Sequence, residues 1–522
     1  MPQRPIQSER RSWWALFALW MLVGTTWALA TPPVTGPDEV EQARRAAAVV
    51  RGELIGARQP GVPPLVVDVD VPDTYGEASV DHWRCFLGPL VDGSPQDAMP
   101  LPPSTCPEIS SSRDRVTVQT VQYRGQPFFY AWVGMGTWWP GVAGMYLMRL
   151  LSIVPVAALL ASAARSLLEA RRGRVAALAL AVTVTPMVLY LAASTNPSGL
   201  ETAAAIAAWT AGLALADASI PVTRRSLARF GVALVVLALA RGLGPLFAAT
   251  VLGGVAVVAG WRRSVDLARR RDLWAWGAAL AVAVALSAAW LAHLQADYAL
   301  PDRPGTGWTT ALGYLPWYLR QAVGVFGTND SALQPLVAAA WVAVAAGVIA
   351  AGLWRAAGRA RLVALGALVA GLAIQVTAEG LSLPPIGFFW QGRYALPLLV
   401  GVVLVAAASA PARPAAPTGA APADAPGRLL VAGAAAVLGV VQVLAFLTVL
   451  RRYTSRGPGS LGLADALLDP RWHPPVAPLA LLVAFIAAVV GTLVVLIRGA
   501  EAGPVGSPAV DTTPTQPVST TA

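Results

Sequence analysis

The sequence predicts an all-α polytopic integral membrane protein with about twelve transmembrane helices and one large loop outside the membrane. Of its 522 residues, 56% are hydrophobic and only 13% are charged, whereas charged residues make up about 25% of a typical soluble protein. Apolar runs of about 20 residues, the length that crosses a bilayer, recur along the chain. One polar insertion, residues 31–140, separates the first run from all the others.

Residues 1–30 are expected to form a cytoplasmic N-terminus and the first transmembrane helix. Arg10 and Arg11 precede an apolar run from about Trp13 to Ala30. A cleaved signal peptide has a shorter apolar core and a clearer cleavage site. We therefore expect an uncleaved helix whose N-terminus stays in the cytoplasm.

The insertion begins with a predicted amphipathic helix, for which Thr35 is a suitable cap, Pro37 a suitable first residue and Gly56 a suitable end. Apolar residues recur there at spacings of three and four, which makes one apolar stripe beside a charged face. This pattern is typical of a helix that lies flat on a membrane surface. Such a helix would hold Asp38 and Glu39 just outside the bilayer, although acidic residues in a first turn also simply complement the helix dipole.

The rest of the insertion predicts a small β excursion and a disulfide. Residues 65–71 and 116–121 have the β-branched, alternating pattern of strands. Cys85 and Cys106, the two cysteines of the chain, lie between them. An oxidising compartment would favour a disulfide worth roughly 3 kcal/mol; two free thiols are the alternative. The aromatic stretch 127–139 is too short to span the bilayer and indicates an interfacial or re-entrant helix.

Residues 141–410 are expected to hold transmembrane helices 2–10, and residues 428–498 helices 11 and 12. The Pro/Ala-rich segment 411–427 predicts a flexible cytoplasmic linker, and the polar tail 499–522 a disordered one. Arginines favour the loops that would be cytoplasmic, so both termini are expected inside and the insertion outside. The predicted spans lie near residues 142–165, 174–193, 197–215, 226–241, 243–260, 273–292, 334–354, 361–379, 393–410, 429–450 and 476–497.

Three arginines gather at the predicted outer ends of the helices. Arg149 lies inside a span, where an arginine is costly unless it lines a cavity or meets an anion. Arg241 and Arg393 lie at about the same depth. Together they would face Asp38 and Glu39, which indicates a site for an anionic headgroup beside two carboxylates. Each arginine taken singly is also explained by snorkelling to the surface.

Two short polar segments complete this set. Asn196 opens a predicted span in which Ser198 and Glu201 have the spacing of a capping box, so capping alone would explain that segment. Gln391 and Tyr394 flank the third arginine at the outer end of another span. No nucleotide-binding loop or dinucleotide glycine pattern is present in the sequence. We therefore expect no nucleotide cofactor. We also expect no nucleic acid as a partner, because the arginines that make the chain basic lie between apolar runs and are explained by membrane topology.

Several motifs carry a resemblance to known proteins: Pro37-Asp-Glu, Gln126-Pro-Phe-Phe-Tyr130, Met145-Tyr-Leu-Met-Arg-Leu150, Ser194-Thr-Asn-Pro-Ser-Gly199 and Gln391-Gly-Arg-Tyr-Ala-Leu-Pro397. Over about the first 400 residues, the chain resembles an uncharacterised family of bacterial predicted membrane proteins, domain of unknown function 2142. That family is in turn similar to the GT-C glycosyltransferases. These enzymes carry an acidic pair straight after the first span and take a sugar from a polyprenyl phosphate at the outer face of the membrane.

The resemblance implies a GT-C-like fold and a glycosyltransferase in the plasma (inner) membrane of a bacterium. Asp38 or Glu39 would be the catalytic carboxylate. The partners would be a polyprenyl-phosphate-linked sugar, a cell-envelope glycan or lipid acceptor, and membrane lipid. The substrate-binding residues would be Arg149, Asn196, Arg241, Gln391, Arg393 and Tyr394.

Two alternatives stay open at this point. The wider family often has a histidine two or three positions after its acidic pair, where this chain has Glu41 and Gln42, which argues against a histidine-assisted or metal-bound site. In the first alternative, the acidic pair nevertheless holds a divalent ion such as Mg²⁺ or Mn²⁺ instead of supplying a base. The chain would alternatively be a non-enzymatic flippase, transporter or envelope-assembly scaffold. A transporter should have polar residues near the middle of the membrane, whereas here they collect at the outer rim.

Overall fold

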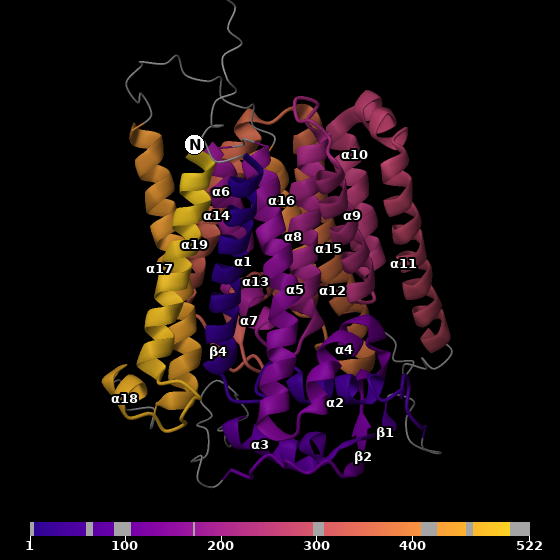
Figure 1. The fold of residues 1–522 in the computed structure, drawn as a ribbon, viewed down its shortest axis with the longest axis vertical. Coiled ribbons are helices and arrows are strands. Elements are labelled where there is room, and N and C mark those ends of the chain that lie inside the picture. The colour runs from indigo at the N-terminus through magenta and orange to yellow at the C-terminus, as the bar shows by residue number, and fades with distance from the viewer. Residues whose placement is uncertain are drawn as a thin grey trace, which may run out of the picture.

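The structure, a computed structural model, describes residues 5–58, 66–87, 106–170, 173–295, 307–408, 425–455 and 463–501. It has a bundle of long helices and, at one end of the bundle, a layer built from the polar insertion (Figure 1). Most of the predicted linker 411–427 and of the predicted tail 499–522 lies outside the described residues.

The bundle contains helices of unequal length. Their bounds are α1 (Pro5–Leu29), α5 (Gly141–Glu169), α6 (Gly173–Thr183), α7 (Pro186–Ala192), α8 (Pro197–Ala216), α9 (Arg224–Ala240), α10 (Gly244–Ala268), α11 (Arg271–Gln295), α12 (Trp308–Gly313), α13 (Leu315–Gly324), α14 (Pro335–Arg355), α15 (Gly358–Ile386), α16 (Leu396–Ala408), α17 (Ala425–Thr454), α18 (Leu463–Leu468) and α19 (Pro478–Glu501). A short hairpin, β3 (Val325–Phe326) with β4 (Ser331–Ala332), follows α13.

Among the described residues, nine helices are long and apolar enough to cross a membrane, and the pair α6 and α7, bent by 57°, would make a tenth. The chain is thus a multi-pass membrane protein. All twelve predicted spans are helical, but α9 has only 17 residues and α16 only 13. At 1.5 Å per residue, α9 is about 26 Å long, less than the roughly 30 Å of the hydrocarbon core. The predicted count of about twelve is therefore not confirmed by the described residues.

Helix α8 lies at the centre of the bundle. Its spanning segment is entirely buried, and α5, α9, α10 and α16 pack against it. Alanines make up much of its surface, as at Ala203, Ala204 and Ala205, so neighbouring helices approach closely, as is common between membrane helices. The residue that opens α8, Asn196, thereby lies where several helices end together.

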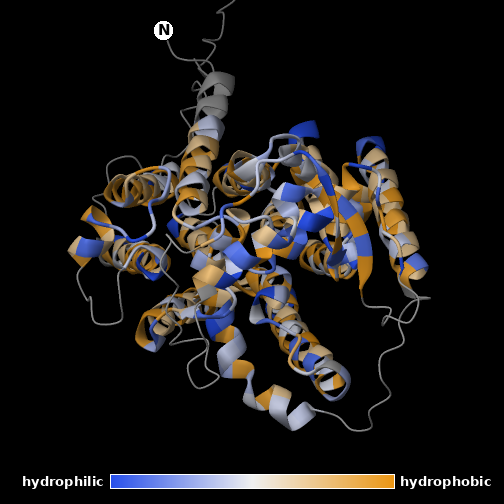
Figure 2. Ribbon diagram, turned by 90° about the horizontal axis from the view of Figure 1, so that it is seen from below, coloured by the Kyte–Doolittle hydropathy of each residue, from blue (hydrophilic) through white to orange (hydrophobic). Residues whose placement is uncertain are grey.

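The insertion forms a compact layer over the helix ends (Figures 1 and 2). It contains α2 (Glu39–Val49), α3 (Glu77–Leu87), α4 (Pro127–Val133) and the 3-10 helix η4 (Gly134–Trp138). The two predicted strands are present as β1 (Val67–Pro72) and β2 (Arg115–Thr120), which pair antiparallel with Val69 opposite Val118. Cys85 at the end of α3 forms a disulfide with Cys106.

Helix α2 differs from the predicted surface helix in length and in burial. It begins at Glu39 and ends at Val49, not at Gly56, and Thr35 bonds the Pro32 carbonyl instead of capping it. Almost every residue of α2 is buried, because its arginines bond carbonyl groups of the surrounding layer. Arg44 donates to Tyr75 and Gln119, and Arg45 donates to Leu54 and Gly125. The charged face is thus a buried polar network rather than a face turned to water.

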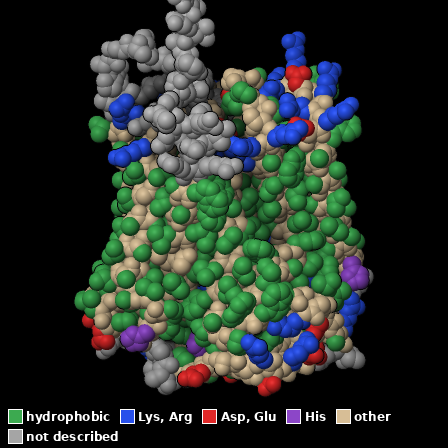
Figure 3. Space-filling view, in the orientation of Figure 1, with side chains coloured by type: hydrophobic (Ala, Val, Ile, Leu, Met, Phe, Trp, Pro, Cys, Tyr) green, Lys and Arg blue, Asp and Glu red, His purple; other side chains and the backbone are tan. Residues whose placement is uncertain are grey.

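The aromatic stretch before α5 folds into the short helices α4 and η4. Trp132 and Trp138 lie on them and Trp139 follows directly, and these side chains are 41%, 57% and 56% exposed. Tryptophans are enriched where a membrane meets water. The space-filling view shows a wide hydrophobic band between two charged ends, and arginines crowd the end that carries the N-terminus (Figure 3).

Candidate functional site

The site is organised by an unusual backbone conformation at the start of α2. Asp38 has φ 56° and ψ 14°, in the left-handed region, which a non-glycine residue seldom adopts and which aspartate tolerates better than most. The chain turns sharply there. As a result the two adjacent acidic side chains point to different surroundings: that of Asp38 is 44% exposed, and that of Glu39 only 3%.

Glu39 is bound on both carboxylate oxygens. Arg149, from α5, donates to it from Nε at 2.8 Å and from Nη2 at 2.6 Å. The backbone N–H groups of Gly36 and Thr195 donate at 2.9 and 3.0 Å. Burial works against ionisation of this carboxyl, but Arg149 and the N–H groups outweigh it and lower the pKa of Glu39 below its ordinary value. Glu39 is therefore held as a carboxylate and has no free face.

Arg149 is equally occupied. Its side chain is 1% exposed, and it also donates to the backbone carbonyls of Ala28, Thr31 and Pro32 at 2.7–2.8 Å. This arginine therefore joins the end of α1, the start of α2 and α5 in one buried connection. Instead of facing an open cavity, as the sequence suggested for it, Arg149 fixes the frame that carries Asp38.

Asp38 is paired with Arg393, another of the three predicted arginines. Nη2 of Arg393 lies 2.9 Å from Oδ2 of Asp38, and the arginine side chain is 2% exposed. Its Nε is buried and has no hydrogen-bond partner. A guanidinium has five N–H donors, so Arg393 holds Asp38 while donors remain for another group.

The third arginine, Arg241, follows α9 and is 30% exposed. Its Nη1 donates to the Ser198 hydroxyl at 3.1 Å and lies 3.5 Å from Oε2 of Glu201. Asn196 caps α8 by accepting from the Ser198 N–H group, and its side chain also donates to the Pro37 carbonyl at 3.0 Å. The capping box expected from Ser198 and Glu201 is therefore absent, because Asn196 is the cap and Glu201 faces the arginine.

Tyr394 lies against both Arg241 and Arg393. Its ring centroid lies 4.3 Å from the Arg241 guanidinium carbon and 5.2 Å from that of Arg393, which is cation–π geometry. Tyr130 of α4 lies below, buried and hydrogen-bonded to Gln42. Burial raises the pKa of Tyr130 to about 12 although Arg45 and Arg241 lower it, so this hydroxyl stays protonated at neutral pH.

The segment around Arg393 is held in place from two sides. Glu379, at the end of α15, accepts from the N–H groups of Phe389 and Trp390 at 3.3 and 2.5 Å. Gln321 of α13 accepts from the Gly392 N–H group at 2.8 Å. A Cβ at Gly392 would lie 1.9 Å from the Tyr318 carbonyl oxygen, so only glycine fits there. Gln391 lies half-buried at the start of this turn.

The structure thus brings together nearly all of the predicted site residues, but in specific pairs. Arg149 is bound to Glu39, Arg393 to Asp38, and Arg241 to the neighbourhood of Glu201. Sequence reasoning missed Glu201 as an arginine partner and also missed Gln321. The available signal for Glu201 was an acidic residue near the start of an otherwise apolar helix. Nothing in the sequence around Gln321 distinguishes that residue.

The geometry also decides which ligands the acidic pair is able to hold. Both oxygens of Glu39 are taken by Arg149 and two N–H groups, so Asp38 and Glu39 do not share a metal-binding position. Within the ranges that the structure describes, no three His, Cys, Asp or Glu residues gather as metal ligands. What the site offers is one partly exposed carboxylate beside two arginines that keep unused donors.

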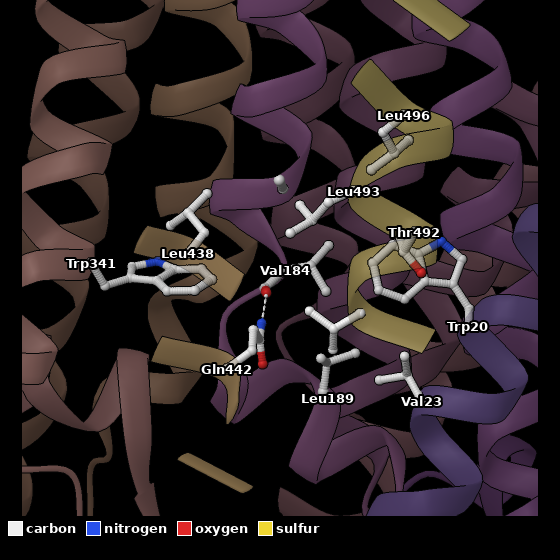
Figure 4. A pocket seen from close by; sticks show the side chains of 12 residues that line it. Trp20, Val23, Val184, Leu189, Trp341, Leu438, Gln442, Thr492, Leu493 and Leu496 are labelled. Carbon is white, nitrogen blue, oxygen red and sulfur yellow. Dashed lines mark hydrogen bonds between the residues drawn. The ribbon is translucent and has the colours of Figure 1, made fainter. Parts of the chain in front are cut away.

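A cavity inside the bundle lies apart from this site (Figure 4). Its volume is about 30 Å³, and its lining is almost wholly apolar, so it has room for about one water molecule. Gln442 of α17 donates there to the Val184 carbonyl at 2.8 Å, while its Oε1 is buried without a partner. The cavity is too small for a sugar.

The chain matches the model of a known protein family. The model of a protein family described as Predicted membrane protein (DUF2142) matches residues 21–402, which include every residue of the site. No curated protein and no solved structure matches the chain.

Proposed function

We propose that this chain, which belongs to the DUF2142 family of predicted membrane proteins, is a GT-C-like membrane glycosyltransferase. It would move a sugar from a polyprenyl-phosphate donor to a cell-envelope glycan or lipid acceptor. The observation that carries the proposal is Asp38. A left-handed backbone and an arginine hold this partly exposed carboxylate at the end of the bundle that the layer formed by the polar insertion covers. Residues with strained backbone conformations cluster at functional sites.

In the proposed reaction, Asp38 is the general base. An acceptor hydroxyl approaches the anomeric carbon of the donor sugar, and its oxygen forms the new C–O bond. The bond from the anomeric carbon to the phosphate oxygen breaks, and the polyprenyl phosphate leaves with the electron pair. Asp38 takes the hydroxyl proton. A phosphate is a good leaving group without protonation, so a second carboxylate is not required to act as an acid.

The arginines have separate roles in this proposal. Arg393 and Arg241 would donate their unused N–H groups to the phosphate oxygens, on which negative charge grows as the bond breaks. Tyr394 would hold the two guanidinium planes in position through its ring. Glu39 and Arg149 are positioning residues, because they touch no substrate and fix the turn that presents Asp38. This narrows the expected catalytic pair to one residue.

The proposal includes a direction in the membrane. Arginines crowd the bundle end at which α1 begins (Figure 3), and arginine-rich loops favour the cytoplasmic side. The layer with Asp38 lies at the opposite end (Figure 1). The site would then face the outside of a bacterial inner membrane, and the Cys85–Cys106 disulfide suits that oxidising side.

A direct test uses the purified protein in lipid nanodiscs with a panel of polyprenyl-phosphate-linked sugars. Release of polyprenyl phosphate in the presence of envelope glycans is the expected result. Arg393→Gln should weaken donor binding, whereas Arg84→Gln should not, since Arg84 pairs with Asp81 outside the site. Donor binding without release, over the whole panel of acceptors, would favour a flippase or a scaffold and contradict the enzyme.

A further inference from the structure

Another cavity, lined in part by arginines, lies in the outer layer, at the other end of α2 from Asp38. The 11 residues of α2 separate the two places by about 16 Å. The cavity has a volume of about 310 Å³, which is at the lower limit of small-molecule sites. Its lining comes from the turn that follows α2, the end of the β1–β2 pair where β1 stops and β2 starts, and the entry to α5. It includes Arg51, Ser112, Arg113, Arg115, Thr137 and Trp138.

The cavity carries more positive than negative charge. Arg51 donates at 2.7–3.0 Å to the Thr137 hydroxyl and to the carbonyls of Ala47 and Thr137. All three acceptors are neutral, and no carboxylate of the described residues pairs with Arg51. Burial and the positive charge of Arg115 lower the pKa of Arg51, although Tyr75 and the nearby carboxylate of Glu53 act in the opposite direction.

The carboxylates nearby are already engaged. The Glu53 carboxylate forms an ion pair with the Arg115 guanidinium at 2.6 Å and accepts a hydrogen bond from the Asp70 N–H group. Asp114 accepts from the Ser112 hydroxyl at 2.8 Å. Arg113 is exposed, and within the described residues it forms no hydrogen bond or ion pair. Two guanidinium groups, those of Arg51 and Arg113, are therefore available to an anion.

The position of the cavity indicates where that anion comes from. Trp138 lines it and is 57% exposed, and Pro140 lies between it and Gly141, the first residue of the spanning helix α5. An exposed tryptophan directly before a span marks the membrane surface. Lipid headgroups lie at that level, with the phosphate beside the acyl chains.

We propose that this cavity binds the phosphate group of an anionic membrane lipid. Arg51 and Arg113 would donate to the phosphate oxygens, Thr137 and Ser112 would offer hydroxyls, and Trp138 would contact the start of the acyl chains. The site does not use Asp38, Arg241 or Arg393, so it does not depend on the proposed enzyme. Its effect would be to fix the outer layer on the membrane surface.

The test is retention of phosphatidylglycerol by the full-length protein, measured by native mass spectrometry during titration against phosphatidylcholine. An arginine near an anionic surface is worth about fivefold in affinity. Arg113→Ala should therefore weaken phosphatidylglycerol binding about fivefold, and Arg51→Ala with Arg113→Ala by more. Arg113 is exposed and forms no hydrogen bond or ion pair with the described residues, so its replacement should leave the fold intact. Arg84→Ala, an exposed arginine outside the cavity, is the matched control and should bind as wild type.

A second titration separates the lipid from its headgroup. Glycerol 3-phosphate should compete only weakly, because it lacks the acyl chains that the tryptophan contacts. Equal retention of phosphatidylglycerol by wild type and the double variant would overturn the site. Saturation by glycerol 3-phosphate at the same concentrations as the lipid would overturn the assignment to a membrane lipid.

Discussion

Replacement of Glu39 by glutamine should destabilise the protein by about 3–5 kcal/mol, the cost of removing one partner of a buried ion pair. The structure explains why the cost lies in this range. The glutamine keeps the shape of the side chain but not its charge, so it leaves Arg149, 1% exposed, as an uncompensated cation. It also weakens the acceptance of hydrogen bonds from Gly36 and Thr195.

The assay is thermal or denaturant unfolding of the purified protein in one detergent, with Asp38→Asn measured in parallel. The Asp38 carboxylate is 44% exposed, but its partner Arg393 is only 2% exposed. Asp38→Asn should therefore cost more than the roughly 1 kcal/mol of a fully exposed pair and less than Glu39→Gln, because water still screens this carboxylate. A combined change, Glu39→Gln with Arg149→Met, should recover much of the loss, because neither charge is then left alone. If Glu39→Gln unfolds within about 1 kcal/mol of wild type, the positioning role of this pair is refuted.

Three further outcomes follow from the same contacts. Folding lowers the pKa of Glu39 below its ordinary value of 4.5. The carboxylate therefore stabilises the fold fully at neutral pH, and this stabilisation is lost as the pH falls from 4.5 through the folded-state pKa. In that acidic range, the unfolding curves of wild type and Glu39→Gln should converge. Reduction of Cys85–Cys106, which closes a loop of 21 positions, should cost about 3 kcal/mol and speed proteolysis of the outer layer. Gly392→Ala should cost at least about 1–3 kcal/mol in unfolding experiments, because its Cβ would overlap the Tyr318 carbonyl oxygen.

The positions of the long helices could be predicted from the sequence, but the number of helices that cross the membrane could not. Length and hydropathy located every apolar segment, since each is a continuous run bounded by polar residues. Helices α9 and α16 show the limit: both are helical where expected, yet both are short and pack against the buried helix α8. Periodicity does not show whether a short apolar helix meets lipid or other helices.

Helix α2 shows a second limit. Its stripe of apolar residues was correctly recognised, but charged residues were assigned to water. Arg44 and Arg45 are instead buried against backbone carbonyls that come from residues 31 to 80 positions away in the chain. A pattern of charges cannot reveal such distant acceptors.

The candidate site was predictable as a set of residues but not as pairs. Arg149, Arg241 and Arg393 were expected at one level beside two acids, and the structure places them around the start of α2 and α8. Asp38 is partly exposed and Glu39 is buried because the backbone of Asp38 has a left-handed conformation. That conformation has no clear signature in the sequence, because most aspartates in first turns have ordinary angles.

The central claim, that Asp38 is a general base, is tested most directly by the turnover of Asp38→Asn. The measurement is release of polyprenyl phosphate from a bound donor, with donor affinity determined on the same preparation. The account predicts a loss of turnover of about a hundredfold to ten-thousandfold, with donor affinity close to wild type. Asp81→Asn, which replaces another exposed, arginine-paired carboxylate, should retain full turnover. Undiminished release by Asp38→Asn would contradict the account.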